Sequence, residues 1–354
     1  MRRLILGAGV LTLLVAGCTA AAHLKVLQPP AAPSSPPITV PAAAVVARPS
    51  PGHFPQLGID IDLYTYPGQD VAAAAATDVA YIASLHANAV SVSFPFFMTG
   101  PNAASVHASS ATPSPSQLAV LVHDAEQAGL YVSIRPLLDE GHLGQSRVQW
   151  VPADPAAWFA SYWRFLEPYA VMAQAEHVQV FIVGTEFSRF SRSSRWNVLD
   201  RALRGRYHGA LACANSWGGT VFTGDCGRGV TEAVDAYHPQ RGNLLAGWEA
   251  FDRKLPRGTV ETEVGIAAVT GADKQPYQHR WPTRSLNQSV QARWFTAACQ
   301  AATRTHLGGI YFWTLGFSQT IGSGPTLADQ GRWAGGQGAR AIAACFAAVE
   351  GTDQ

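Results

Sequence analysis

The sequence predicts one α/β domain with the architecture of a (β/α)8 barrel, the TIM barrel. From residue 57 to residue 349, short apolar runs typical of strands alternate with longer amphipathic runs typical of helices. Eight strand-like runs fall in this interval, the number that closes a parallel barrel. The alternative, an open doubly wound sheet, usually has a glycine-rich phosphate-binding turn after its first strand, and residues 60–64 contain no glycine.

The strand-like runs are short, and most of them are rich in β-branched or aromatic residues. The clearest is the fourth, where Val178 and residues 180–183 form the nearly continuous apolar run that a buried parallel strand requires. Ser116 is expected to cap the second helix, and Pro155 suits the first turn of the third. The strands are expected at 57–63, 88–94, 130–136, 178–183, 210–215, 233–237, 259–263 and 308–313, and the helices at 70–86, 116–128, 155–176, 286–305 and 336–349.

The chain begins with a segment typical of export rather than of a folded core. Residues 1–18 combine two arginines, an apolar run too short to span a bilayer, and the ending Val-Ala-Gly-Cys. This ending resembles the lipobox of bacterial lipoproteins, in which the cysteine carries the lipid; the alternative is an ordinary secretory signal with an incidental Cys18. Residues 19–52 are rich in alanine and proline, as an extended spacer is. We therefore expect a barrel domain at 53–354, tethered through Cys18 to the outer face of a bacterial membrane.

Composition and cysteine content narrow the possible functions. The chain has a net charge of +1 and only 14% charged residues, so its composition does not indicate binding to nucleic acid. We expect the protein to be a monomer. Four cysteines remain after Cys18, and an even number in an exported protein indicates two disulfides with three possible pairings. We favour Cys213 with Cys226, which closes a local loop, and Cys299 with Cys345, which joins the last two helices. Four buried thiols are the alternative, and the spacing matches no zinc site.

Two acidic residues stand at the ends of predicted strands. Glu186 follows the fourth strand, and Glu263 ends the seventh. Barrel enzymes keep their chemistry at the carboxyl ends of the strands, and strands four and seven lie on opposite walls, so these side chains can converge over the mouth. Two carboxyl groups suffice for hydrolysis of a glycosidic bond, about 5–5.5 Å apart in retaining enzymes and roughly 6.5–9.5 Å apart in inverting ones.

Four segments of the chain resemble glycoside hydrolase clan A, and within it the β-mannanase-containing family 113. They are residues 158–162, 183–187, 262–265 and 311–313, within a likeness that spans about residues 57–349. The resemblance implies that Glu186 is the general acid/base and Glu263 the nucleophile. It also implies that Trp313 forms the platform under the sugar. Many clan members have asparagine before the acid/base, and this chain has Thr185 there.

The resemblance implies roles for two further residues, and position alone marks others. By resemblance, Tyr237 can hydrogen-bond the nucleophile and Arg135 can hold it ionised. Asn215 and Trp217 follow the fifth strand and are candidate sugar contacts. Asp60 and Asp62 share one face of the first strand, where they bind sugar hydroxyls or form ion pairs inside the barrel.

Glu261 competes with Glu263 for the role of nucleophile. The alternation of side chains along a strand places both residues on one face, so one of them is expected to be a structural acid. Glu263 is favoured because Gly265 marks the end of the strand.

These observations predict a retaining glycoside hydrolase acting on a polysaccharide or glycoconjugate near the cell surface. A β-linked mannan is the first candidate substrate through the family likeness alone. The chemistry requires neither a metal nor an organic cofactor. Two alternatives stay open: a barrel that binds glycans without cleaving them, and a transglycosylase that uses the same two glutamates.

The membrane tether can be tested directly. Cys18→Ser removes the only atom to which the lipid can be attached, so the variant should move from the membrane fraction to the soluble fraction of cells that export it. Immunoblotting of the two fractions measures this. Unchanged partitioning of the variant would refute the lipid anchor.

Overall fold

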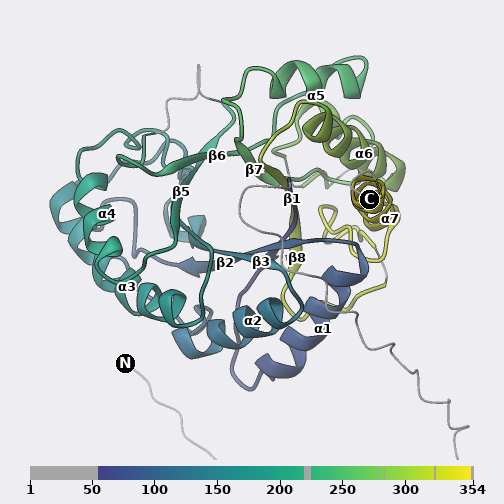
Figure 1. The fold of residues 1–354 in the computed structure, drawn as a ribbon. Helices are drawn as coiled ribbons and strands as arrows, with labels where there is room; N and C mark the ends of the chain where they lie inside the picture. The colour runs from purple at the N-terminus through teal and green to yellow at the C-terminus, as the bar shows by residue number, and fades with distance from the viewer. Residues whose placement is uncertain (1–54, 219–224, 279, 283, 323, 352–354) are drawn as a thin grey trace, which may run out of the picture. The chain divides into compact units, whose positions relative to one another are not determined.

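Eight parallel strands pair in chain order and close into a barrel, because β1 pairs with both β2 and β8 (Figure 1). The computed structural model describes residues 55–218, 225–278, 280–282, 284–322 and 324–351. The barrel fold expected from the sequence is confirmed, whereas the signal segment, Cys18 and the spacer lie outside the described residues. The strands are β1 Gln56–Asp62, β2 Ala89–Phe96, β3 Tyr131–Leu138, β4 Val180–Thr185, β5 Ala210–Ser216, β6 Thr231–Asp235, β7 Val260–Val264 and β8 Gly309–Gly316.

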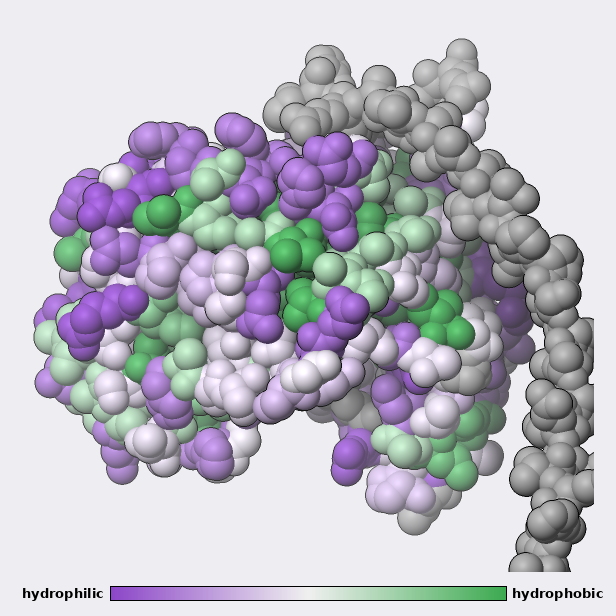
Figure 2. Space-filling view, turned by 90° about the horizontal axis from the view of Figure 1, so that it is seen from below, coloured by the Kyte–Doolittle hydropathy of each residue, from purple (hydrophilic) through white to green (hydrophobic). Residues whose placement is uncertain are grey.

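Helices surround the strands on the outside of the barrel (Figure 1). Within the described residues, none of them is both long enough and apolar enough to span a bilayer. Figure 2 shows one face of the molecule, on which hydrophobic and hydrophilic residues are interspersed. The helices are α1 Val71–Ser84, α2 Pro115–Gln127, α3 Pro155–Ala175, α4 Trp196–Arg204, α5 Leu244–Asp252, α6 Gln288–Arg304 and α7 Gln337–Glu350.

The sequence prediction missed α4 and α5 and misplaced one cap. Both missed helices have nine residues, and a segment of that length is too short to show helical periodicity clearly. The cap of α2 is Ser114 rather than Ser116. The Ser114 hydroxyl accepts the backbone N–H of Gln117, and the Gln117 side chain accepts the backbone N–H of Ser114, which together form a capping box.

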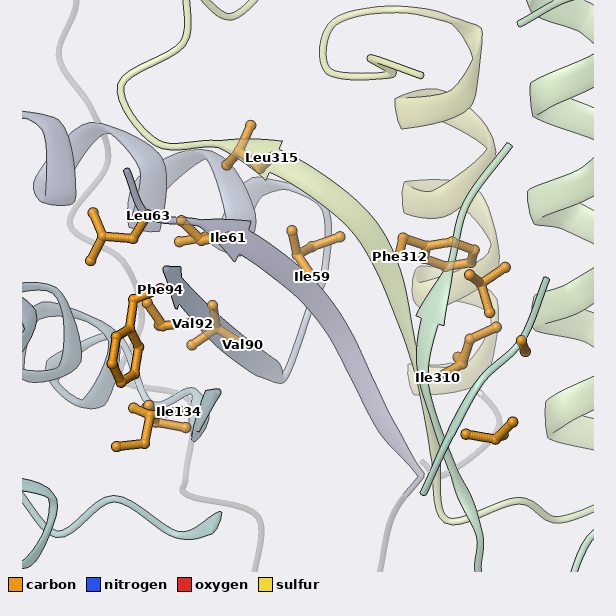
Figure 3. Packing of buried hydrophobic residues seen from close by; sticks show 14 of the residues in the cluster. Ile59, Ile61, Leu63, Val90, Val92, Phe94, Ile134, Ile310, Phe312 and Leu315 are labelled. Carbon is orange, nitrogen blue, oxygen red and sulfur yellow. The ribbon is translucent and has the colours of Figure 1, made fainter. Parts of the chain in front are cut away.

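The hydrophobic core lies between the strands and the helices. Alternate residues of each strand point outward into it, such as Ile59 and Ile61 of β1 beside Val90 and Val92 of β2 (Figure 3). The intervening residues of β1, Asp60 and Asp62, occupy the opposite face of the strand. The outward faces therefore hold the barrel and helices together and leave the inward faces free to carry polar groups.

The polarity of the side chains inside the barrel changes along the barrel axis. Small and apolar side chains of β4 and β5, including Ile182 and Ala212, pack together in the interior. At the amino-terminal end of the strands lies a cavity of about 600 Å³, lined by residues such as Gln56, Ser133 and Tyr311. Polar and charged residues are found toward the carboxyl ends of the strands, which is where the candidate site lies.

Both disulfides have the pairing favoured from the sequence. Cys213 of β5 is bonded to Cys226, with 5.7 Å between their Cα atoms. Cys299 of α6 is bonded to Cys345 of α7, with 6.4 Å between their Cα atoms. These pairings exclude the alternative of four buried thiols, and the second one joins the last two helices of the barrel.

Candidate active site

Glu186 and Glu263 stand at the carboxyl ends of β4 and β7. The backbone of Glu186 has a φ of 56°, in the left-handed region, and its N–H donates to the carbonyl of Ala214 at 2.8 Å. A non-glycine residue in this region is uncommon and marks a place where the surrounding structure dictates the backbone. The Glu186 side chain is only 12% exposed and that of Glu263 only 4%. Burial raises the pKa of Glu186, and the charge of Glu263 adds to this rise.

Arg135 of β3 is fully buried and pairs with Glu263 in the middle of the barrel. Its guanidinium donates to Glu263 Oε1, to Asp235 Oδ2 at 2.8 Å and to Thr185 Oγ1 at 3.1 Å. Its Nη1 atom lies 3.6 Å from Asp60 Oδ2. Arg135 therefore lies beside Glu263, and Thr185, a candidate sugar contact in the sequence, accepts a hydrogen bond from this arginine.

Each carboxylate around Arg135 has a second partner that orients it. The hydroxyl of Thr262 donates to Asp235 Oδ1 at 2.8 Å, and that of Ser93 donates to Asp60 Oδ1 at 2.7 Å. Burial raises the pKa of both aspartates, and the Arg135 charge opposes this rise. The sequence analysis missed Asp235, although its position at the end of β6 was a signal that could have revealed it.

Tyr237 holds the other oxygen of Glu263. Its hydroxyl donates to Glu263 Oε2 at 2.7 Å, while Arg135 donates to Oε1. Burial and the Glu263 charge both raise the pKa of Tyr237, so the phenol stays protonated and keeps its proton for this hydrogen bond. Both oxygens of Glu263 are therefore held by donors, which fixes the orientation of the carboxylate.

The expectation that Glu261 and Glu263 share one face of the strand is wrong. Val234 of β6 pairs with Glu261 of β7. The next residue of β6, Asp235, pairs with Glu263, two residues further along β7, so the register between the strands shifts here. An extra residue of this kind turns the following side chain to the other face. Glu263 consequently faces Arg135, whereas Glu261 is fully buried against Asp252 of α5. Burial and the Asp252 charge raise the pKa of Glu261, and burial raises that of Asp252 to about 7.

Arg147 forms an ion pair with Glu186 that the sequence did not reveal. It lies in the long loop after β3, and its Nη2 atom is 3.0 Å from Glu186 Oε2. The Arg147 backbone N–H donates to Glu140 at 2.7 Å, and its side chain donates to the Leu138 carbonyl at 3.4 Å. Burial raises the pKa of Glu186, and the Arg147 charge opposes this rise. Nothing in the local sequence marks a loop arginine as the partner of a residue 39 positions away.

A pocket of about 470 Å³ opens beside this network. Trp313 of β8 and Asp62 of β1 both line it. Trp313 also lies against Arg135, whose guanidinium carbon is 5.6 Å from the ring centroid. Burial raises the pKa of Asp62 to about 7, with a smaller contribution from the Glu263 charge. Asp60 and Asp62 therefore differ in role, because Asp60 joins the Arg135 network whereas Asp62 faces the pocket.

Among the described residues, neither Asn215 nor Trp217 forms a hydrogen bond with the side chain of Glu186 or Glu263. Asn215 is buried on β5, and its Nδ2 has no hydrogen-bond partner among the described residues. Trp217 stacks on Tyr277 with 5.9 Å between the ring centroids and meets His238 edge to face. His238 is thus part of an aromatic cluster, and no group of three potential metal ligands occurs in the described part of the chain.

The sequence matches one family model, described as Glycoside Hydrolase Family 113, over residues 64–320. No curated protein sequence matches the chain.

Solved structures of known glycosidases share the fold. One is the GH113 β-mannanase AaManA from Alicyclobacillus acidocaldarius in complex with ManMIm, with 20% identity and a TM-score of 0.68 over 83% of this chain and 97% of that chain. A second GH113 β-1,4-mannanase has 18% identity and a TM-score of 0.69, covering 82% and 98%. A family 5 mannosidase from Rhizomucor miehei is more distant, with 10% identity and a TM-score of 0.51, covering 84% and 94%.

The Arg135 network predicts a specific stability defect. Arg135→Met leaves several buried carboxylates without their cation, so the free energy of unfolding at neutral pH should fall by about 3–5 kcal/mol. The pKa values of Asp60 and Asp235 would then rise further above their unfolded values. A carboxyl group whose pKa is raised in the folded state destabilises that state as pH rises and the group ionises. The loss of stability should therefore be smaller at about pH 5 than at neutral pH.

Urea unfolding at the two pH values measures this defect. Arg206→Met is the matched control, because Arg206 forms an exposed ion pair with Glu167 and its loss should cost about 1 kcal/mol or less. A defect of Arg135→Met that does not depend on pH would contradict the proposed electrostatic origin.

Proposed function

The chain belongs to glycoside hydrolase family 113, and from this membership we propose that it cleaves β-mannan-type glycosidic bonds with retention of configuration. Glu263 acts as the nucleophile and Glu186 as the general acid/base. The observation that carries this assignment is the pair of donors, Arg135 and Tyr237, that hold the two oxygens of Glu263 in place. Such a carboxylate is oriented for attack on an anomeric carbon in front of it.

Glu263 has the environment that a nucleophile needs. A nucleophile must be held in the orientation for attack, and the Arg135 guanidinium and the Tyr237 hydroxyl each donate to one oxygen of Glu263. In the covalent intermediate, the Glu263 oxygen bonded to the sugar no longer carries the negative charge. The donors around it are then available to stabilise the return of that charge when the intermediate is hydrolysed.

Glu186 has the opposite environment, which suits a group that first gives and then takes a proton. Burial and the Glu263 charge both raise the pKa of Glu186, which favours the protonated form needed to protonate the leaving oxygen. When Glu263 becomes covalently bonded and loses its charge, one of these causes disappears and the pKa of Glu186 falls. The same residue can then act as a base that activates water in the second step.

The choice of substrate follows from the family and from the aromatic surface in the pocket. Two of the solved structures with this fold are described as β-1,4-mannanases or β-mannanases, and we extend that activity to this chain. The Trp313 ring lines the pocket next to the Arg135 network and offers a flat surface for the apolar face of a sugar. We further propose that the enzyme acts as a monomer at the cell surface, tethered through Cys18.

The nucleophile assignment can be tested against its closest competitor. Glu263→Ala should reduce kcat on a β-1,4-linked manno-oligosaccharide by a factor on the order of 10⁴ or more, because it removes the attacking group. Added azide should restore part of the activity and give a product of inverted configuration. Glu261→Gln is the control, and it should retain activity because Glu261 faces Asp252 rather than the pocket. Full activity of Glu263→Ala, or loss of activity only in Glu261→Gln, would overturn the assignment.

The ion pair of Arg147 with Glu186 predicts a change in pH dependence. The alkaline limb of kcat/KM reports the pKa of the general acid in the free enzyme. Arg147 opposes the rise of the Glu186 pKa, so Arg147→Gln should move this limb toward higher pH by about one unit.

Initial-rate measurements across the pH range test the prediction. Arg253→Gln serves as the control, since it removes a charge that pairs with Glu249 on the outer helices. An alkaline limb that stays in place or moves to lower pH in Arg147→Gln would show that Arg147 does not control the proton donor.

A further inference from the structure

The pocket beside Trp313 has a donor-rich side that the proposed hydrolysis does not use. Its wall includes Gln319, which follows β8, Arg332 in the segment before α7, and Arg280 in the loop after β7. Asp62 and Trp313 belong to the same lining. The pocket therefore extends from the catalytic network to two cationic side chains and an amide.

Two of these side chains have donor groups without partners. The Nε and Nη2 atoms of Arg332 are buried and have no hydrogen-bond partner in the described part of the chain, and the same is true of Gln319 Nε2. Buried polar groups are nearly always paired, so unpaired donors in residues that line a pocket need a reason. A guanidinium presents its N–H groups as a planar fork, a shape that matches a carboxylate.

The acidic residues of the pocket do not neutralise Arg332. Asp329 accepts the backbone N–H of Arg332 at 3.2 Å, and among the described residues Arg332 forms no ion pair within 4.0 Å. The Asp62 carboxyl has a pKa raised to about 7 by burial, so near neutral pH it carries only part of its negative charge. Arg332 therefore has no carboxylate paired with its guanidinium among the described residues, and an anionic group could take that place.

The segment that carries Arg332 is tied to the opposite loop. The Gln330 side chain accepts the backbone N–H of Trp281 at 2.8 Å and donates to the Trp281 carbonyl at 3.1 Å. The Gln330 carbonyl accepts the backbone N–H of Ala268 at 2.7 Å. These bonds fix the backbone next to Arg332 before any ligand binds, which lowers the entropic cost of binding.

We propose that this pocket is an anion-binding subsite, and that the substrate is a β-linked glycan whose sugars carry carboxylate groups. On binding, the Arg332 side chain turns its unpaired N–H groups toward the carboxylate, and the Gln319 amide turns to donate to the same sugar. The inference rests on the proposed glycan-cleaving function and deepens it, because it names an acidic polysaccharide rather than a neutral one as the preferred substrate.

The test compares two ligands that the enzyme cannot hydrolyse. One is a sulfur-linked β-1,4-mannotriose, and the other is the same trisaccharide with each C6 oxidised to a carboxylate. Isothermal titration calorimetry on the full chain at neutral pH should give about tenfold tighter binding of the acidic ligand, the gain expected of one charge-assisted hydrogen-bonded pair. Arg332→Gln should abolish this preference and leave the affinity for the neutral ligand within about twofold.

Two further variants separate the pocket from general charge effects. Arg340→Gln removes an exposed arginine of α7 outside the pocket lining and should keep the full preference. Gln319→Leu changes no charge and should reduce the affinity for the acidic ligand, and this variant tests the pocket even if Arg332→Gln folds poorly. Equal binding of the two ligands by the unaltered protein, or a preference that survives in both Arg332→Gln and Gln319→Leu, would overturn the subsite.

The outcome is independent of whether the enzyme hydrolyses mannan. Oxygen-linked mannotriose and its acidic counterpart are assayed in parallel for release of reducing ends. Preferential binding of the acidic sulfur-linked ligand with no cleavage of either oxygen-linked sugar would support the subsite and refute the hydrolase mechanism. Cleavage of both oxygen-linked sugars with equal binding of the two sulfur-linked ligands would support the hydrolase mechanism and refute the subsite.

Discussion

The charge of Arg135 must be balanced inside the barrel, and much of the site follows from that constraint. A buried guanidinium without a partner would cost several kcal/mol, so carboxylates have to approach it from more than one direction. Asp60 comes from β1, Asp235 from β6 and Glu263 from β7, which joins widely separated walls of the barrel around one cation. The hydroxyls of Ser93, Thr185 and Thr262 complete the hydrogen bonding. The ion pairs that balance the charge of Arg135 also fix the orientation of the Glu263 carboxylate.

The two glutamates at the barrel mouth differ because their partners differ. Glu263 is bonded to the buried arginine and to a phenol, both of which belong to strands or to the residues directly after them. Glu186 is instead paired with Arg147, which is carried by a loop. Different environments for two carboxyl groups are what separates a nucleophile from a proton donor. A partner on a loop can also move more easily than one on a strand, which suits the residue that changes its protonation state in the proposed mechanism.

The register shift in β7 decides which acid faces the site. Without it, Glu261 and Glu263 would point the same way, away from Arg135, because Val260 and Thr262 of the same strand face the barrel interior. Glu261 faces outward to Asp252, and the extra residue turns Glu263 inward. A second consequence is a pair of buried carboxyl groups between β7 and α5 whose pKa values are raised. Irregularities of this kind are common next to active sites, because they re-aim a single side chain without disturbing the sheet.

The sequence alone determined the barrel and its strands, because hydrophobic periodicity can be read locally and parallel strands end together. It favoured both disulfide pairings, and its resemblance to family 113 implied the placement of Arg135 and Tyr237 around Glu263. Tertiary structure alone decided the short helices α4 and α5, the inward turn of Glu263, the partnership of Arg147 with Glu186, and the unpaired donors of Arg332. Each of these depends on how loops or strand registers meet across the fold. Contacts between residues far apart in the chain have no periodic signature, so only the closed barrel reveals them.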